Sequence, residues 1–174
     1  MQASENAAFD SAIVYLKTAR ELLGSRGWKL EPVLTSHIYI AEAKARFVSG
    51  DIAVMETLVE EVLQRDLPIE DKFGAYELKI LAAHGDNKFD EAIAISLDVR
   101  RQLRFKRIRT KNSSVTVLRE YLKTNRATKG WSTAELAELP DLTDKRIIMG
   151  QRILQLVRPN ISFDTKMVAY LYDN

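Results

Sequence analysis

Apolar side chains recur at the three- and four-residue spacing of α-helices, in segments separated by glycine, proline and acidic residues. No segment shows the sustained alternation of a β-strand, and no Asn-Gly or Asp-Gly hairpin turn is present. The pattern therefore predicts an all-α protein. We expect the following sets to form the buried faces of successive helices: Phe9, Ile13, Leu16, Arg20 and Leu23; Leu34, Ile38, Ala41, Ala45 and Val48; Ile52, Met55, Leu58, Val59 and Val62; Phe73, Tyr76, Ile80 and Ala83; Phe89, Ala92, Ile93, Ser96, Val99 and Leu103.

Two Gly-Asp pairs, Gly50-Asp51 and Gly85-Asp86, each end one predicted helix and precede the next. They lie 35 residues apart (85 minus 50), close to the roughly 34-residue period of tetratricopeptide (TPR) repeats. Short loops make neighbouring helices run antiparallel. The spacing predicts a TPR-like, right-handed α-solenoid of antiparallel helix hairpins over residues 1–104, in which Met55 and Ala92 are equivalent buried positions.

Glycine and proline mark the expected boundary of the first helix. Gly24 and Gly27 are typical of helix C-caps, so we expect the helix to end there. Pro32 is typical of a first helical position, where its missing N–H costs little, and it predicts the start of the second helix.

From about residue 105 the apolar pattern is less regular. We expect residues 105–174 to form an irregular helical C-terminal cap, packed on the solenoid within one continuous domain. Thr143 or Asp144 is placed to cap a helix in this part, and Pro159 is expected to end it. The predicted buried face of that helix comprises Ile147, Ile148, Gln151, Leu154 and Val157.

The composition narrows the class of protein further. With 46% hydrophobic residues, the 174-residue chain can form a substantial core, and the absence of cysteine excludes disulfides and thiolate zinc sites. No apolar run approaches the length of a membrane span, and the N-terminus lacks the order of a signal peptide. We expect a cytoplasmic protein without a membrane span. Because Met1 leads almost directly into an amphipathic helix, we also expect a segment of a larger protein.

The net charge of +2 conceals a strong asymmetry. Residues 100–129 contain eleven basic side chains and one acidic one, so this segment carries +10 and the remainder −8. One interpretation is a site for phosphate or nucleic acid, with Phe105 and Tyr121 as stacking groups. We favour the other, in which a solvated helix end and loop dock against acidic neighbours. The core of this basic patch comprises Arg100, Arg101, Arg104, Lys106, Arg107, Arg109 and Lys111.

No catalytic, cofactor-binding or metal-binding constellation is evident in the sequence. His37 and His84 stand outside any paired metal-ligand motif, and the carboxylates between Glu56 and Asp71 lack the alternation of a calcium loop. There is no phosphate-binding loop, kinase motif or nucleophile elbow. We therefore expect a segment that is not an enzyme.

Aromatic and charged residues on the predicted hairpins suggest where a protein partner binds. Trp28 and Trp131 each follow a glycine at a connection; they line a peptide groove or, as we favour, pack beneath loops. TPR geometry would place a groove on the first helix of each hairpin. The exposed, partner-binding candidates there are Tyr39, Glu42, Arg46, Tyr76 and Lys79.

Five segments carry a resemblance to a known family: FDSAIVYLKTARELL, GDIAVMETLVEEVL, DKFGAYELKI, GDNKFDEAIAISLDVRRQL and LKTNRATKGWSTAELAELPDLTDKRIIMGQRIL. Together they resemble the TPR-like region of large signalling ATPases, which follows a STAND-type AAA ATPase module and often precedes GAF and sensor histidine kinase domains. Some members carry a protein kinase domain at the N-terminus. The stretch LPDLTDKR is the most specific part, although Lys145 stands where the family favours proline.

The resemblance implies a regulatory or scaffolding segment that contacts protein partners or neighbouring domains of the same chain. It implies no catalytic residue and no cofactor in this segment. Two other functions remain open from the sequence: binding of nucleic acid or another polyanion through residues 100–129, and sensing of a small molecule by a helical repeat domain.

Overall fold

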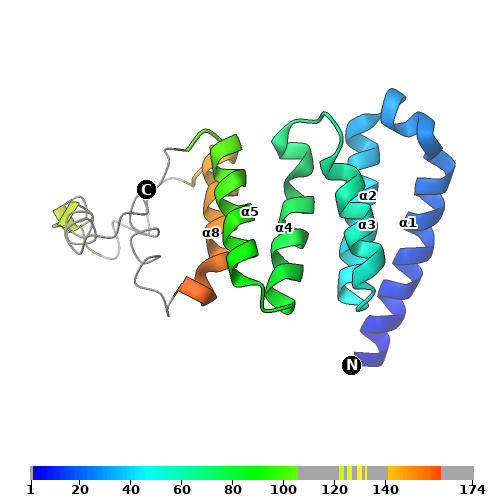
Figure 1. The fold of residues 1–174 in the computed structure, drawn as a ribbon, viewed down its shortest axis with the longest axis horizontal. Helices are drawn as coiled ribbons and strands as arrows, with labels where there is room; N and C mark the ends of the chain where they lie inside the picture. The colour runs from blue at the N-terminus through cyan, green and yellow to red at the C-terminus, as the bar shows by residue number, and fades with distance from the viewer. Residues whose placement is uncertain are drawn as a thin grey trace. The chain divides into compact units, whose positions relative to one another are not determined.

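The computed structural model describes residues 2–105, 122–123, 125–126, 129–130, 132 and 141–161. All regular secondary structure in these residues is helical, with no β-strand, so the predicted all-α class is confirmed. The helices are shown in Figure 1: α1 (Gln2–Leu30), α2 (Pro32–Val48), α3 (Ile52–Leu63), α4 (Ile69–Gly85), α5 (Phe89–Gln102) and α8 (Lys145–Ile161).

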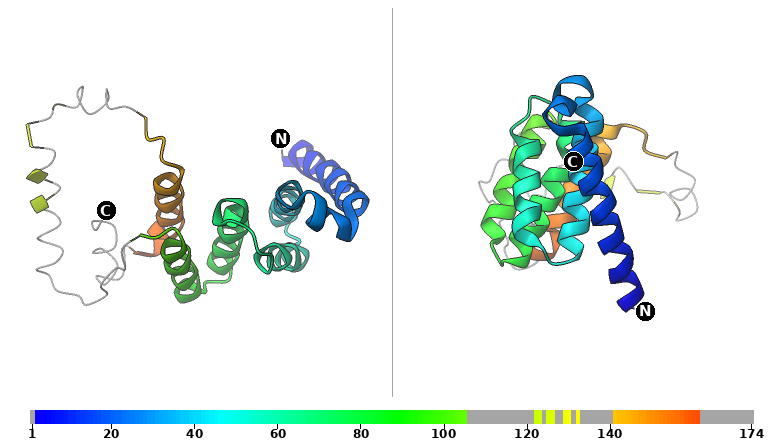
Figure 2. Two further views of the ribbon diagram at one scale, coloured as in Figure 1. Left: turned by 90° about the horizontal axis from the view of Figure 1, so that it is seen from above. Right: turned by 90° about the vertical axis from the view of Figure 1, so that its right-hand side faces the viewer.

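The chain divides into two compact units, residues 1–99 and residues 100–174, and the boundary lies within α5. In the first unit α2 is the central helix, because it packs against α1, α3 and α4, while α3 also packs against α4. Seen from above, α2 and α4 lie on one side and α3 on the other (Figure 2). This arrangement places three neighbours around α2.

The hydrophobic core of the first unit lies between α2, α3 and α4. On α3 the predicted Met55, Leu58, Val59 and Val62 are buried and Ile52 is partly buried. In α4 the predicted Phe73, Ile80 and Ala83 are buried. Met55 and Ala92 are both fully buried, as their predicted equivalence requires. The buried members of the central cluster are Tyr39, Ala43, Met55, Leu58, Val59, Val62, Ala75 and Leu78.

The buried face of α2 differs from the predicted one, with which it shares Ala45. Leu34 and Val48, which were expected to be buried, are 49% and 48% exposed. Compared with the orientation that the apolar spacing predicts, α2 is rotated about its axis. The face that it buries carries polar groups with partners on three neighbouring helices. The residues buried on α2 are Thr35, Ser36, Tyr39, Glu42, Ala43 and Ala45.

The predicted end of the first helix is correct at Gly24 and wrong at Gly27. Gly24 has a positive φ of 52° and a ψ of −157°, so it interrupts the helix in a conformation that glycine adopts easily, and a second helical segment then runs to Leu30 within α1. Gly27 is buried inside this continuation, where a Cβ would lie 2.7 Å from Thr35 Oγ1. Gly27 therefore permits close approach of α1 to α2 instead of ending the helix.

The turns after α2 and α4 have the same backbone hydrogen bonds, although their Gly-Asp pairs are not equivalent. The N–H groups of Gly50 and Asp51 donate to residues three and five positions earlier, and so do those of Asn87 and Lys88. Gly50 and Asn87 both have positive φ, 82° and 59°, a conformation that asparagine tolerates. The equivalent positions are therefore 37 residues apart (87 minus 50), which is also the separation of Met55 and Ala92 (92 minus 55).

In the second unit, the structure tests three predictions about α8. Asp144 caps the helix, since its Oδ1 accepts hydrogen bonds from the backbone N–H of Arg146 at 2.9 Å and of Ile147 at 3.4 Å. The helix ends at Ile161, two residues after Pro159, so the predicted end lies close to the observed one. Leu154 and Val157 are buried as predicted, whereas Ile148 and Gln151 are exposed.

Gly74 lies close to Ile40 where α4 packs on α2, and its substitution tests that packing. A Cβ on Gly74 would lie 2.7 Å from Ile40 Cγ2, which belongs to a stiff β-branched side chain. We expect Gly74→Ala to lower the free energy of unfolding by about 1–2 kcal/mol, because the steric cost exceeds the helix-propensity gain.

Gly85→Ala is the matched control for this substitution, since nothing lies within 4 Å of its Cβ position and its φ is not positive. We expect its stability to stay constant or to rise by up to about 1 kcal/mol. Urea unfolding followed by circular dichroism measures both variants. Equal stability of the two would contradict the close contact between α4 and α2.

Candidate functional site

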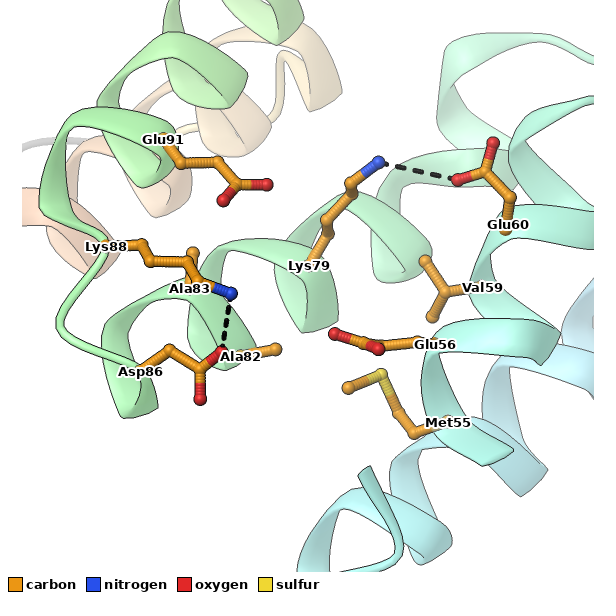
Figure 3. Close-up of a pocket in the computed structure, with 10 residues that line it drawn as sticks. All are labelled: Met55, Glu56, Val59, Glu60, Lys79, Ala82, Ala83, Asp86, Lys88 and Glu91. Carbon is orange, nitrogen blue, oxygen red and sulfur yellow. Dashed lines mark hydrogen bonds and ion pairs between the residues drawn. The ribbon is translucent and has the colours of Figure 1, made fainter. Parts of the chain in front are cut away.

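A pocket of about 320 Å³ opens between α3, α4 and the first turn of α5 in the first unit (Figure 3). Its apolar lining comes from Met55 and Val59 on α3 and from Ala82 and Ala83 on α4. Met55, Val59 and Ala83 belong to the buried core, so the base of the pocket is rigidly packed. The charged residues around this base are Glu56, Glu60, Lys79, Asp86, Lys88 and Glu91.

Two ion pairs neutralise part of the charge around the pocket. Lys79 Nζ lies 3.4 Å from Glu60 Oε2, and Lys88 Nζ lies 2.8 Å from Asp86 Oδ2. The hydrogen bond to Asp86 raises the pKa of the Lys88 ammonium, and more distant Glu91 and Glu56 act in the same direction. Lys88 therefore remains charged throughout the physiological pH range.

The other two carboxylates, Glu56 and Glu91, make no direct hydrogen bond or ion pair with any residue that the structure describes. Figure 3 shows them pointing into the pocket from opposite sides. With four carboxylates and two ammonium groups, the lining carries a net charge of −2 (two minus four). The pocket thus combines an apolar base with unneutralised negative charge.

The structure brings few of the predicted partner-binding residues to this pocket. Lys79 lines it, with a side chain 39% exposed. Tyr76 is half-buried on α4 and is not part of the lining. Tyr39 and Glu42 are buried, so the prediction that they are exposed is wrong, because they face the core side of α2. Arg46 is partly buried and pairs with Asp51 at 2.8 Å.

Glu42 forms a buried ion-pair network instead of a binding surface. Its side chain is fully buried, and its Oε2 accepts a hydrogen bond from Arg20 Nε of α1 at 2.7 Å. Arg46 Nη2 lies 3.7 Å from the other carboxylate oxygen. The bond to Glu42 raises the pKa of the Arg20 guanidinium, although burial opposes it. Arg20 thus supplies the main compensation for a buried negative charge.

A second, larger groove of about 660 Å³ lies beside Trp28 and Tyr39. The two rings pack with centroids 4.8 Å apart, and Arg65 covers Trp28 at 4.6 Å. Glu61 Oε1 accepts hydrogen bonds from Trp28, Tyr39 and Arg65 at 3.1, 3.1 and 2.9 Å. Burial, reinforced by this carboxylate, raises the pKa of the Tyr39 hydroxyl. Trp28 thus lies within α1 and packs against residues of α2 and α3, not beneath a loop as predicted, whereas Trp131 lies outside the described residues.

The charges of this groove balance, unlike those of the first pocket. Three basic residues and three acidic ones line it, and Glu61 already bonds three donors. The lining charged residues are Arg20, Lys29, Arg65, Glu21, Glu61 and Asp66. We regard the groove as a structural contact between α1, α2 and α3.

The predicted basic patch begins with a residue that is not available at the surface. Arg100 is 4% exposed and lies over the ring of Phe105 at 4.8 Å, with Arg146 near the same ring at 5.6 Å. Arg101 and Arg104 are exposed. The remaining members, Lys106, Arg107, Arg109 and Lys111, lie outside the described residues.

The two histidines have ordinary structural surroundings. His37 Nε2 lies 3.7 Å from Asp71, and His84 packs edge-on near Phe89, where burial lowers its pKa. Within the described residues, no three His, Asp or Glu side chains are placed to hold a metal ion. Every helix in the same part of the chain is too short or too polar to cross a membrane.

Comparisons of the chain with protein-family models, curated proteins and solved structures find no match. The sequence identified Lys79, but it considered Glu56 and Glu60 only as members of a rejected calcium loop and missed Asp86, Lys88 and Glu91. The close spacing of charged residues around Gly85-Asp86 was the sequence feature from which these three could have been predicted.

Substitution of Arg20 tests the buried ion-pair network. Arg20→Met leaves the Glu42 carboxylate buried with only Arg46 nearby, so we expect it to lower the free energy of unfolding by about 2–3 kcal/mol. Adding Glu42→Gln should recover at least about 1 kcal/mol, because it removes the buried charge. Thermal and urea unfolding measure both effects.

Lys17→Met is the matched control, because Lys17 belongs to an exposed pair with Glu21 on the same helix, 3.9 Å apart. Its effect should stay below about 0.5 kcal/mol. If Arg20→Met and Lys17→Met have equal effects, the network does not stabilise the packing of α1 on α2.

Proposed function

We propose that this chain is a non-catalytic, TPR-like interaction and regulatory module of a multidomain signalling ATPase or kinase. In this proposal α2 with α3 and α4 with α5 form antiparallel hairpins of a right-handed α-solenoid. The module binds protein partners or neighbouring domains of its own chain.

One observation carries the proposal: α2 packs both on α3, its neighbour in the chain, and on α4, the first helix of the next hairpin. In a helical repeat each unit touches only the next, so first helices stack on first helices. The matching hydrogen bonds of the turns at Gly50 and Asn87, and the buried positions Met55 and Ala92, support the same arrangement.

Exposed apolar residues on α1 support a role in binding. Leu22 follows Tyr15 by seven residues and Val14 by eight, so the three side chains lie on one face of the helix. Leu22 is 84% exposed. Apolar surface that stays exposed on a protein often marks a contact with another protein or domain. This face is a candidate contact for a neighbouring domain of the proposed larger protein.

A regulatory role follows from how such repeats connect. Because each hairpin contacts only its neighbours, a partner that shifts one interface reorients the next one. The ATPase context rests on the sequence resemblance. Reading the gene on either side tests it: an ATPase module upstream and a GAF or kinase module downstream support it, and an open reading frame ending at Asn174 contradicts it.

A peptide selection tests the interaction function directly. Immobilised chain is exposed to a display library of random peptides, and the enriched peptides are synthesised and titrated against soluble chain. We expect enrichment of peptides that share a motif and bind with a Kd on the order of micromolar, the range of about −8 kcal/mol. Absence of enrichment, or equal binding to heat-unfolded chain, would contradict the proposal.

A further inference from the structure

We propose that the pocket between α3, α4 and α5 binds a basic segment of a protein partner, by taking up one lysine or arginine side chain flanked by apolar residues. The inference rests on the proposed function, and it adds the chemical class of the partner and the place where it binds.

The size and base of the pocket suit a long side chain with an apolar stem. Its volume of about 320 Å³ is at the lower end of the range of about 300–1,000 Å³ for ligand pockets, so it suits a short element of a partner. Ala82 is only partly buried and offers apolar surface to methylene groups, and the core residues Met55 and Val59 complete the apolar lining. Lysine and arginine pack their stems on such surface while the charged head stays near water.

The charges of the lining select a cation. The ammonium groups of Lys79 and Lys88 form their direct ion pairs with Glu60 and Asp86, so Glu56 and Glu91, which attract Lys88 only from a greater distance, can pair directly with a ligand. These two come from different helices and point into the pocket from opposite sides (Figure 3). A cationic head between them would complete two ion pairs, whereas an acidic segment would meet a net charge of −2.

A labelled peptide of alternating lysine and leucine is the probe, titrated into the full chain by fluorescence anisotropy. We expect Glu56→Gln/Glu91→Gln to bind it roughly tenfold more weakly, as expected for the loss of two solvent-exposed ion pairs. Binding of the original chain should weaken as salt is added, because the ion pairs are screened. A peptide with glutamine in place of lysine should bind at least about tenfold more weakly than the lysine peptide.

Two further variants distinguish binding in the pocket from non-specific electrostatic attraction of the peptide to the protein. Asp10→Asn/Glu31→Gln removes the same charge from exposed residues outside the pocket, and its affinity should stay within about twofold of the original. Ala82→Met fills the apolar base without changing charge, and it should weaken binding several-fold. Ala82 is only partly buried, so this variant can fold; circular dichroism and the unfolding midpoint verify each variant.

The outcomes distinguish this inference from the proposed function. Equal losses for the two charge-removing variants, an unaffected Ala82→Met variant, or no binding of the lysine peptide overturn the basic-segment site. If the peptide selection then still enriches a motif that lacks lysine and arginine, the interaction function stands and only the site assignment fails. If neither experiment yields a binder, both fail.

Discussion

The packing of the first unit depends on the hydrogen bonds of polar residues that α2 buries. Ser36 Oγ donates to the Asp71 carbonyl of α4 at 2.7 Å, and Tyr39 donates to Glu61 of α3 at 3.1 Å. Glu42 accepts from Arg20 of α1 at 2.7 Å. An unsatisfied buried polar group costs about 1–3 kcal/mol, so an alternative rotation of α2 would lose several such bonds at once. Each neighbour is thus bound to α2 by its own polar contact.

This constraint positions the candidate site. The bond from Ser36 and the close approach of Gly74 to Ile40 place α4 against α2. With α3 packed on both helices, Ala82 and Ala83 of α4 come to lie opposite Met55 and Val59 of α3. The charged residues that follow α4 surround that apolar base because the turn through Asn87 brings α5 to the same edge.

Apolar periodicity predicts the elements whose buried faces are apolar and fails where a buried face is polar. The faces of α3 and much of α4 are of the first kind, and Asp144 is a local capping signal that needs no distant partner. The face of α2 is of the second kind: Thr35, Ser36 and Glu42 look like surface residues until their partners are known. Those partners lie 22 or more positions away for Glu42 and Ser36, beyond any local pattern.

The same reason explains why the pocket was only partly predictable. Lys79 was identified from its place on a first helix, but the convergence of Glu56 and Glu91 depends on the turn and on tertiary packing. The Gly-Asp repetition indicated the correct helix boundaries while suggesting a period of 35 residues. The two matching turns are 37 residues apart, because Asn87 takes the left-handed position that Gly50 takes in the first turn.

The most direct test of the central position of α2 is disulfide trapping between α2 and α4, in a chain that contains no cysteine of its own. A Cβ at position 74 would lie 3.9 Å from Ile40 Cβ, within the range of about 3.5–4.5 Å for disulfides. Ile40→Cys/Gly74→Cys should therefore cross-link almost completely under mild oxidation, as counted by free thiols. Ile40→Cys/Gly85→Cys should not cross-link. Equally low cross-linking of the two pairs would contradict the packing of α4 on the central helix α2.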